Sequence, residues 1–280
     1  MDFPSRDFGG TGEPLHFLHA NGFPPECYIP LLKLLATRYH VFGMLMRPLW
    51  ESSSLEELID WHPLSDDLNQ YLTTLPVGNL IGVGHSLGAV VTLRSALKAP
   101  LNFRALILLD PVLFTPTVIH GWQLVKKLGL GYKIHPLIPA AKERRRYFDN
   151  HDVIYRAYRS KKVFRYIEDE NLKVMISGLL KPSQNRGYEL AYSPEWEIRI
   201  YYSGVSSDAD IWRRLPDLKI PTLIIRGAET DTFYPSTAAR IKRIRPKTEV
   251  ATVDKSTHLV PLERPNELSE IIFNFLEKVT

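Results

Sequence analysis

Apolar and polar positions alternate along this chain in two kinds of block. Short apolar runs are typical of buried strands, and longer segments with apolar positions three or four apart are typical of helices packed on one side. The short runs predict strands at residues 15–18, 40–46, 79–83, 104–109, 218–226 and 249–253. The longer segments predict helices at residues 26–39, 55–75, 87–98, 236–244 and 265–279, the second of them broken near Pro63.

This alternation of strands and helices predicts an α/β fold, with a mostly parallel central sheet and helices on both of its faces. The rhythm stops after Asp110. Residues 112–216 carry helical patterns and many aromatic and basic side chains, which indicates a helical cap inserted above the strand ends. We therefore expect a core domain made of residues 1–111 and 217–280 and a cap made of residues 112–216.

The composition adds little to this picture. Hydrophobic residues make up 44% of the chain and charged residues 24%, as in ordinary globular proteins. The net charge of +4 is too small to suggest a nucleic-acid partner. Two basic runs, at residues 142–146 and 240–245, have no interleaved aromatic residues, so we interpret them as solvated helix faces.

Cys27 is the single cysteine, which excludes an internal disulfide and favours a reducing compartment. The first residues lack a secretion signal, and no apolar stretch reaches the roughly 20 residues that cross a membrane. We expect a cytoplasmic protein without stable membrane insertion, whose oligomeric state the sequence does not indicate. Metal-binding spacings are absent, so no metal or other cofactor is expected.

Ser86 stands where a predicted strand meets a predicted helix. Residues 84–88 read Gly-His-Ser-Leu-Gly. The two glycines allow strand and helix to approach, and a sharp turn would expose the serine hydroxyl beside the free N–H groups of the helix start. This pattern favours a hydrolase with a serine nucleophile. It does not fit a dinucleotide-binding turn, because Leu87 stands where glycine would be needed.

A serine nucleophile needs a base, and the base needs an acid that orients it. Open parallel sheets collect such side chains at the carboxyl ends of their strands. His258 follows the last predicted strand, and Asp231 follows the strand before it. We favour Asp231 as the acid. Asp110, which ends the strand after Ser86, and Glu229, in the same loop as Asp231, are the alternatives.

Together these features resemble the α/β-hydrolase superfamily, and more narrowly its carboxylesterase-like serine hydrolases with a helical cap. The resemblance covers residues 6–280. Beside the serine turn, residues 19–23 are similar to the family's oxyanion turn, residues 227–231 to the loop that carries its acid, and residues 257–265 to the loop that carries its base. The chain departs from the family at Ala20, where glycine is usual, and in the loop at residues 46–50.

The resemblance implies roles for individual residues. Ser86 would be the nucleophile and His258 the general base, which Asp231 would orient. The backbone N–H groups of Asn21 and Leu87 would hold the oxyanion.

Aromatic residues in the predicted loops and cap suggest an apolar pocket above Ser86. Its candidate lining residues are Phe23, Trp50, His85 and Trp122, although the place of His85 inside the turn also fits a structural role. Arg47 and the arginines at 144–146 are candidates to pair with a substrate carboxylate.

We therefore expect the hydrolysis of carboxylic esters or similar small acyl compounds through an acyl-enzyme on Ser86. Thioesterases, lactonases, carbon–carbon bond hydrolases and acyltransferases use the same three groups, so these activities stay open. A protein of this fold that binds a small ligand without catalysis is the alternative from another functional class.

Overall fold

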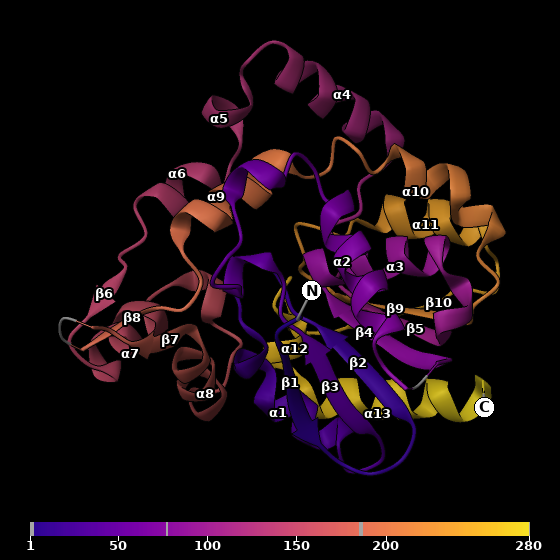
Figure 1. Cartoon of the computed structure of the whole chain (residues 1–280), viewed down its shortest axis with the longest axis horizontal. Coiled ribbons are helices and arrows are strands. Elements are labelled where there is room, and N and C mark those ends of the chain that lie inside the picture. The colour runs from indigo at the N-terminus through magenta and orange to yellow at the C-terminus, as the bar shows by residue number, and fades with distance from the viewer. Residues whose placement is uncertain (1–2, 77, 185–186, 280) are drawn as a thin grey trace.

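One sheet of seven strands forms the centre of the molecule. The computed structural model describes residues 3–76, 78–184 and 187–279. The strands are β1 (Ser5–Gly9), β2 (Pro14–Leu18), β3 (His40–Met44), β4 (Leu80–His85), β5 (Phe103–Leu109), β9 (Thr222–Gly227) and β10 (Glu249–Val253). They lie in the order β1-β3-β2-β4-β5-β9-β10 (Figure 1). β1 runs antiparallel to β3, and the other neighbouring pairs are parallel.

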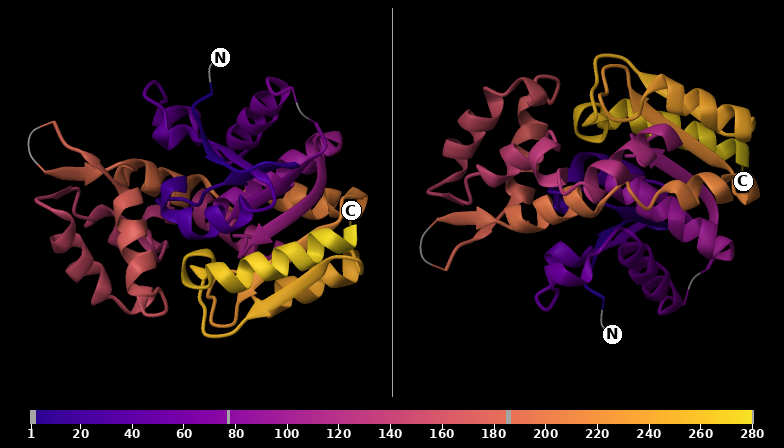
Figure 2. Two further views of the ribbon diagram at one scale, coloured as in Figure 1. Left: turned by 90° about the horizontal axis from the view of Figure 1, so that it is seen from below. Right: turned by 90° about the horizontal axis from the view of Figure 1, so that it is seen from above.

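Helices cover both faces of this sheet (Figure 2). One face carries α2 (His62–Thr73), α3 (Leu87–Lys98) and α11 (Pro235–Ile244), and the other carries α1 (Ile29–Leu35), α12 (Val260–Glu263) and α13 (Pro265–Val279). Neighbouring residues of β5 point to opposite faces, so that Leu106 belongs to the first core and Ile107 to the second. Burial on both faces explains why the strands read as continuous apolar runs. The predicted α/β fold with a mostly parallel central sheet is confirmed.

Two elements differ from the expectation. β1 was not predicted, because it is an exposed edge strand without an apolar face. The segment at residues 55–75 forms a 3-10 turn, η3 (Leu55–Glu57), before α2 begins at His62. Pro63 therefore starts the helix instead of breaking it, since a proline in the first turn removes no helical hydrogen bond.

The chain between β5 and β9 forms a separate group of elements, and we call residues 112–216 the insertion. Its helices are α4 (Pro116–Lys127), α5 (Gly131–Ile134), α6 (Ile138–Lys142), α7 (His151–Arg159), α8 (Asp169–Leu179), α9 (Pro194–Ser203) and α10 (Ala209–Arg214). β6 (Tyr147–Phe148), β7 (Leu180–Pro182) and β8 (Tyr188–Leu190) add a small antiparallel sheet. Strands this short carry no periodic signal, so the expectation of a purely helical segment was incomplete.

The short 3-10 turns complete the list of elements. They are η1 (Pro25–Tyr28), η2 (Arg47–Leu49), η4 (Pro100–Asn102), η5 (Lys162–Phe164) and η6 (Leu215–Asp217). η1 and α1 together replace the single helix expected at residues 26–39. Among the described residues, no helix combines the length and the apolar character needed to cross a membrane.

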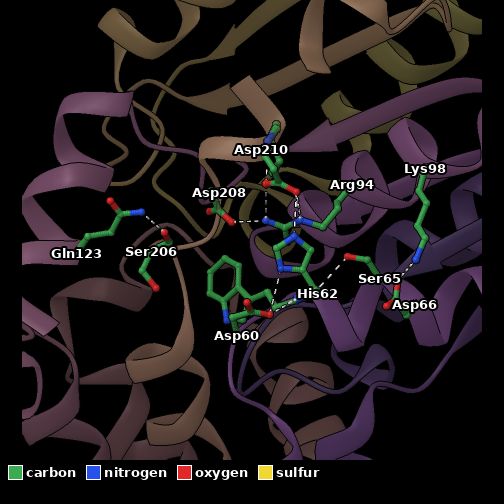
Figure 3. Close-up of polar contacts among 12 residues, drawn as sticks. Asp60, His62, Ser65, Asp66, Arg94, Lys98, Gln123, Ser206, Asp208 and Asp210 are labelled. Atoms are coloured by element: carbon green, nitrogen blue, oxygen red, sulfur yellow. Dashed lines mark hydrogen bonds and ion pairs between the residues drawn. The ribbon is translucent and has the colours of Figure 1, made fainter. Parts of the chain in front are cut away.

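A partly buried charge cluster ties the end of the insertion to the core (Figure 3). Arg94 of α3 donates to Asp208 at 2.5 Å and to Asp210 at 3.3 Å. The ring of His62, at the start of α2, lies 3.1 Å from Asp60 and 2.9 Å from Asp210. α3 is the helix that follows Ser86, so this cluster fixes the exit of the insertion against the helix that carries the candidate nucleophile.

Candidate active site

Ser86 occupies a strained turn between β4 and α3. Its φ is 56° and its ψ is −115°, a conformation that residues with a Cβ rarely adopt. The turn requires the flanking glycines. A Cβ on Gly84 would lie 2.4 Å from the carbonyl oxygen of Gly88, and a Cβ on Gly88 would lie 2.2 Å from that of Leu18. This agrees with the prediction that both glycines allow the strand and the helix to approach each other closely.

His258 lies between Ser86 and Asp110. Its Nε2 is 2.8 Å from Ser86 Oγ, and its Nδ1 is 2.8 Å from Asp110 Oδ1. Because a carboxylate accepts, Nδ1 carries the proton and Nε2 is free to accept the serine proton. Ser86 is 5% exposed, and the side chain of Asp110 is fully buried.

Further hydrogen bonds hold the buried carboxylate of Asp110. Oδ2 accepts the backbone N–H of Gly227 at 2.9 Å, and Oδ1 also accepts the hydroxyl of Thr230 at 2.7 Å. Donors on both oxygens compensate for the loss of water around a buried charge. Gly227 is also tightly placed, because a Cβ there would lie 2.2 Å from the carbonyl oxygen of Thr257. The end of β9 therefore supports both the acid and the loop of His258.

The expectation that Asp231 orients His258 is wrong for this structure. Asp231 is exposed, and its carboxylate accepts the hydroxyl of Thr232 at 3.2 Å. Glu229 accepts from Arg165 and Tyr166, each at 2.6 Å. The sheet topology explains why Asp110, and not Asp231, contacts His258. Asp110 directly follows β5, which pairs with β4 in the sheet, whereas Asp231 lies four residues beyond the end of β9.

The turn at residues 19–23 lies beside the start of α3. Ala20 and Phe23 form an isolated bridge, and Gly22 between them has a φ of 75°. His19 fixes the turn, since its ring accepts the backbone N–H of Met46 at 3.1 Å and donates to the carbonyl of Ala20 at 3.0 Å. The N–H of Leu87, the first residue of α3, has no acceptor within the helix.

The turn at residues 19–23 also contacts α9 of the insertion. Asn21 Nδ2 donates to the backbone carbonyl of Glu197 in α9 at 3.2 Å. The carboxylate of Glu197 accepts from Arg144 at 2.5 Å and from the hydroxyl of Tyr201 at 3.3 Å. A Cβ on Gly22 would lie 3.3 Å from both Arg144 and Glu197. Sequence reasoning missed Glu197, because nothing in the local pattern of α9 connects it with a turn 176 residues away.

His85 is buried with both ring nitrogens hydrogen-bonded, which speaks against its expected place in the lining of a pocket. It is fully buried, and its Nε2 lies 2.8 Å from the backbone carbonyl oxygen of His258. A carbonyl oxygen can only accept a hydrogen bond. Nε2 therefore donates, and Nδ1 accepts the hydroxyl of Tyr28 at 2.8 Å. Burial lowers the pKa of His85 well below its ordinary value, so the ring stays neutral and supports the His258 loop from behind.

The other candidate pocket residues lie in three different surroundings. Trp50 packs edge-on against Phe3 and donates to the carbonyl of Leu45. Phe23 packs against the core on the α1 side of the sheet. Trp122 lies in α4 against the ring of His135. None of these contacts places the three side chains around Ser86. For Phe23 and Trp122 a place in the pocket lining therefore stays a prediction. The packing of Trp50 against the core speaks against such a place for this residue.

The arginines considered for a substrate carboxylate all have acidic partners already. Arg47 donates to Asp67 through two nitrogens, at 2.6 and 2.9 Å, and to Glu57 at 2.8 Å. Arg144 pairs with Glu197, Arg145 with Asp149 and Arg146 with Glu195. Within the described ranges, no three His, Cys, Asp or Glu side chains are grouped to hold a metal ion.

Glu263 is a second residue that sequence reasoning did not assign. Its side chain is buried and accepts both the N–H and the hydroxyl of Thr257, at 2.6 and 2.8 Å. Thr257 directly precedes His258, so Glu263 fixes the loop that carries the histidine. An acidic residue in the apolar stretch after His258 was the signal in the sequence that could have indicated this role.

Fold and site define an α/β protein in which a strained serine, a histidine and a buried aspartate are linked by hydrogen bonds. A model described as the Alpha/beta hydrolase family matches residues 17–271, so the chain belongs to that family and is an enzyme of the hydrolase class. The resemblance seen in the sequence is thereby confirmed.

Relatives support the same assignment. The chain is 21% identical to (E)-2-((N-methylformamido)methylene)succinate hydrolase from Acinetobacter baylyi, over 96% of this chain and 92% of the relative. It is 24% identical to 2-(acetamidomethylene)succinate hydrolase from Mesorhizobium japonicum, over 96% and 89%. A crystal structure of E-2-(acetamidomethylene)succinate hydrolase superposes with a TM-score of 0.77 at 21% identity, covering 99% of this chain and all of that one.

Proposed function

We propose that this protein hydrolyses carboxylic esters or similar acyl compounds through an acyl-enzyme on Ser86. The observation that carries the proposal is the pair of 2.8 Å contacts that connect Ser86 to His258 and His258 to Asp110. In this arrangement the histidine removes the serine proton as the hydroxyl attacks the acyl carbon. It then gives that proton to the leaving alcohol.

The second half of the reaction uses the same groups. Water donates a proton to His258 and attacks the acyl carbon, and the serine leaves with the proton returned to it. Asp110 keeps the ring oriented and stabilises its positive charge. The N–H groups of Asn21 and Leu87 are the proposed oxyanion donors. This assignment is supported by the close packing of α3 against the end of β2, where Gly88 lies against the backbone of Leu18 and His19.

The proposed substrates are uncharged acyl compounds. The two named relatives act on substituted succinates, whose carboxylates call for cationic partners. In this chain Arg47 and Arg144 are each neutralised by a carboxylate at 2.8 Å or less. These pairs favour an ester without a free carboxylate. Hydrolysis of a carboxylate-bearing amide is the second candidate, and it rests on the names of the relatives. Thioester, lactone and carbon–carbon hydrolysis, acyl transfer and ligand binding without catalysis remain outcomes of the substrate tests below.

We further propose that residues 112–216 act as a cap above Ser86. The contact between Glu197 of the insertion and Asn21 of the oxyanion turn supports this, as does the low exposure of Ser86. The single, buried Cys27 supports a reducing, cytoplasmic location.

Labelling with a fluorophosphonate tests the mechanism, because this reagent reacts with activated serines. Strong labelling of the wild type that is lost in Ser86→Ala and His258→Ala would support a serine hydrolase. A folded wild type without labelling would contradict it. The substrate class is then tested with p-nitrophenyl esters of increasing acyl length against a hemisuccinate ester. Faster hydrolysis of the hemisuccinate would overturn the preference for uncharged acyl groups.

A further inference from the structure

An apolar surface extends over α4, α5 and the turns beside them. Seven of the twelve large hydrophobic side chains that are exposed in the described residues lie between positions 118 and 137. We call them the α4–α5 face. Its members are Val118, Leu124, Leu128, Leu130, Tyr132, Ile134 and Leu137. Single exposed apolar side chains are common, but this many within one short segment are typical of an interaction surface, so this face calls for a partner.

α4 is attached to the rest of the protein through its other side. Ile119 is buried, Gln123 donates to the carbonyl of Ser206 at 2.6 Å, and Lys126 donates to the hydroxyl of Ser206 at 3.1 Å. Leu124 and Leu128 are four residues apart, so they lie on one side of the helix, and they are 58% and 62% exposed. Figure 1 shows α4 and α5 at the outer edge of the insertion, away from β1 to β3.

The charged side chains of this segment have one sign. The sequence has no acidic residue between Asp110 and Glu143, but it has lysines at 126, 127, 133 and 142. Among the ion pairs of the described residues, none involves these four lysines. Lys127 and Lys133 are exposed beside the apolar side chains. The partner of this face therefore offers apolar surface together with negative charge.

We propose that the α4–α5 face docks on the surface of an anionic lipid membrane. Leucines and a tyrosine that enter the boundary of headgroups and acyl chains, with lysines reaching the phosphates, form the combination that such surfaces bind. A second copy of the same face is disfavoured, because it would set lysines against lysines without an acid between them. The proposal concerns surface docking, it involves no membrane-spanning helix, and it stands independently of the reaction at Ser86.

Co-sedimentation with phosphatidylcholine vesicles, with and without phosphatidylglycerol, tests this proposal. We expect binding only to the anionic vesicles, weakening as salt is added. The double variant Leu124→Gln/Leu128→Gln should bind roughly tenfold or more weakly. Its matched control, Leu101→Gln/Val163→Gln, changes side chains in η4 and η5 that are 90% and 48% exposed and should bind like the wild type.

The lysines are tested in the same way. Lys127→Gln and Lys133→Gln should each weaken binding roughly fivefold, which corresponds to about 1 kcal/mol per lysine. The controls are the single variants Lys219→Gln and Lys247→Gln, each of which removes one exposed lysine outside the face. Equal losses in both pairs would overturn the proposal, because they would show general charge attraction. Absence of binding to anionic vesicles at low salt would overturn it too.

A third experiment measures directly whether the α4–α5 face lies in the membrane surface, and it does not require a variant that binds less. Cys27 is buried, so a nitroxide can be placed selectively on Leu128→Cys, with Leu101→Cys as the control. With anionic vesicles, we expect the label at position 128 to become accessible to oxygen and protected from a polar nickel reagent, while the label at 101 does not change. A self-association of the protein that shields position 128 without lipid would overturn the proposal in favour of a second copy.

Discussion

Asp110 Oδ1 lies 2.8 Å from His258 Nδ1, although 148 residues separate the two in the chain. The contact joins the end of β5 to the loop after β10 across β9, and Gly227 of β9 donates to the other oxygen of the same carboxylate. The sheet therefore fixes the acid directly, without a long loop between strand and side chain. This arrangement gives both oxygens of the buried carboxylate hydrogen-bond donors and holds the ring of His258 in one orientation.

The first prediction concerns the acid. Asp110→Asn should lower kcat/KM by roughly 10⁴-fold, because an amide no longer selects the histidine tautomer that leaves Nε2 free to accept. Asp231→Asn should stay within about twofold of the wild type, since its side chain is exposed and does not contact His258. Ester hydrolysis by the two purified variants decides the matter. The reverse ranking would restore Asp231 as the acid.

The second prediction concerns the ion pair of Glu197 and Arg144 beside the turn at residues 19–23. Glu197→Gln should reduce stability by about 3 kcal/mol, because it leaves the guanidinium of Arg144 buried without an opposite charge. Because the side chain of Glu197 packs beside Gly22, the change should also lower kcat with little effect on KM. Urea unfolding and steady-state kinetics measure the two effects.

A matched variant separates charge from position at this site. The double change Arg144→Met/Glu197→Met removes both charges and should recover most of the stability, while kcat stays low. A double variant with wild-type kcat would show that the pair serves folding alone.

The third prediction concerns the glycines of the serine turn. Gly88→Ala should abolish activity and destabilise the fold by about 3 kcal/mol or more, because its methyl group would lie 2.2 Å from a backbone oxygen that cannot move freely. Gly121→Ala is the control in another helix, where a methyl group would meet no atom within 4 Å. It should raise stability by roughly 0.5–1 kcal/mol. Thermal unfolding and fluorophosphonate labelling measure both, and an active Gly88→Ala enzyme would refute the packing argument.

The fourth prediction concerns acid lability. Burial lowers the pKa of His16 to about 3 and that of His19 to about 4. Between these values and the ordinary pKa near 6.5, the unfolded chain binds protons at both positions and the folded chain does not. The free energy of unfolding should therefore fall as the pH drops from 6.5 to 4.5, by roughly 2–3 kcal/mol per histidine.

Urea unfolding over this pH range measures the slope. His19→Gln should flatten it, whereas His120→Gln should leave it unchanged, because His120 is exposed. A wild type whose stability does not depend on pH between 4.5 and 6.5 would contradict the prediction.

Much of this molecule followed from local pattern. The sequence predicted β4 and β5 because burial on both faces makes each strand a continuous apolar run. It predicted the turn at Ser86 because strand and helix must approach closely at Gly84 and Gly88. β1 and the small sheet of β6 to β8 were not readable, since they are exposed or too short to show a period.

The sequence by itself determined the α/β fold, the place of Ser86 at the turn and the place of His258 after the last strand, because strand order and chain order bring both to one edge of the sheet. Tertiary structure alone distinguished Asp110 from Asp231, because the sequence shows that both follow strands but not which of them reaches His258. It also decided that Glu197 and Arg144 pair with each other beside the turn at residues 19–23. Pairing between distant charges depends on packing, and no local pattern encodes it.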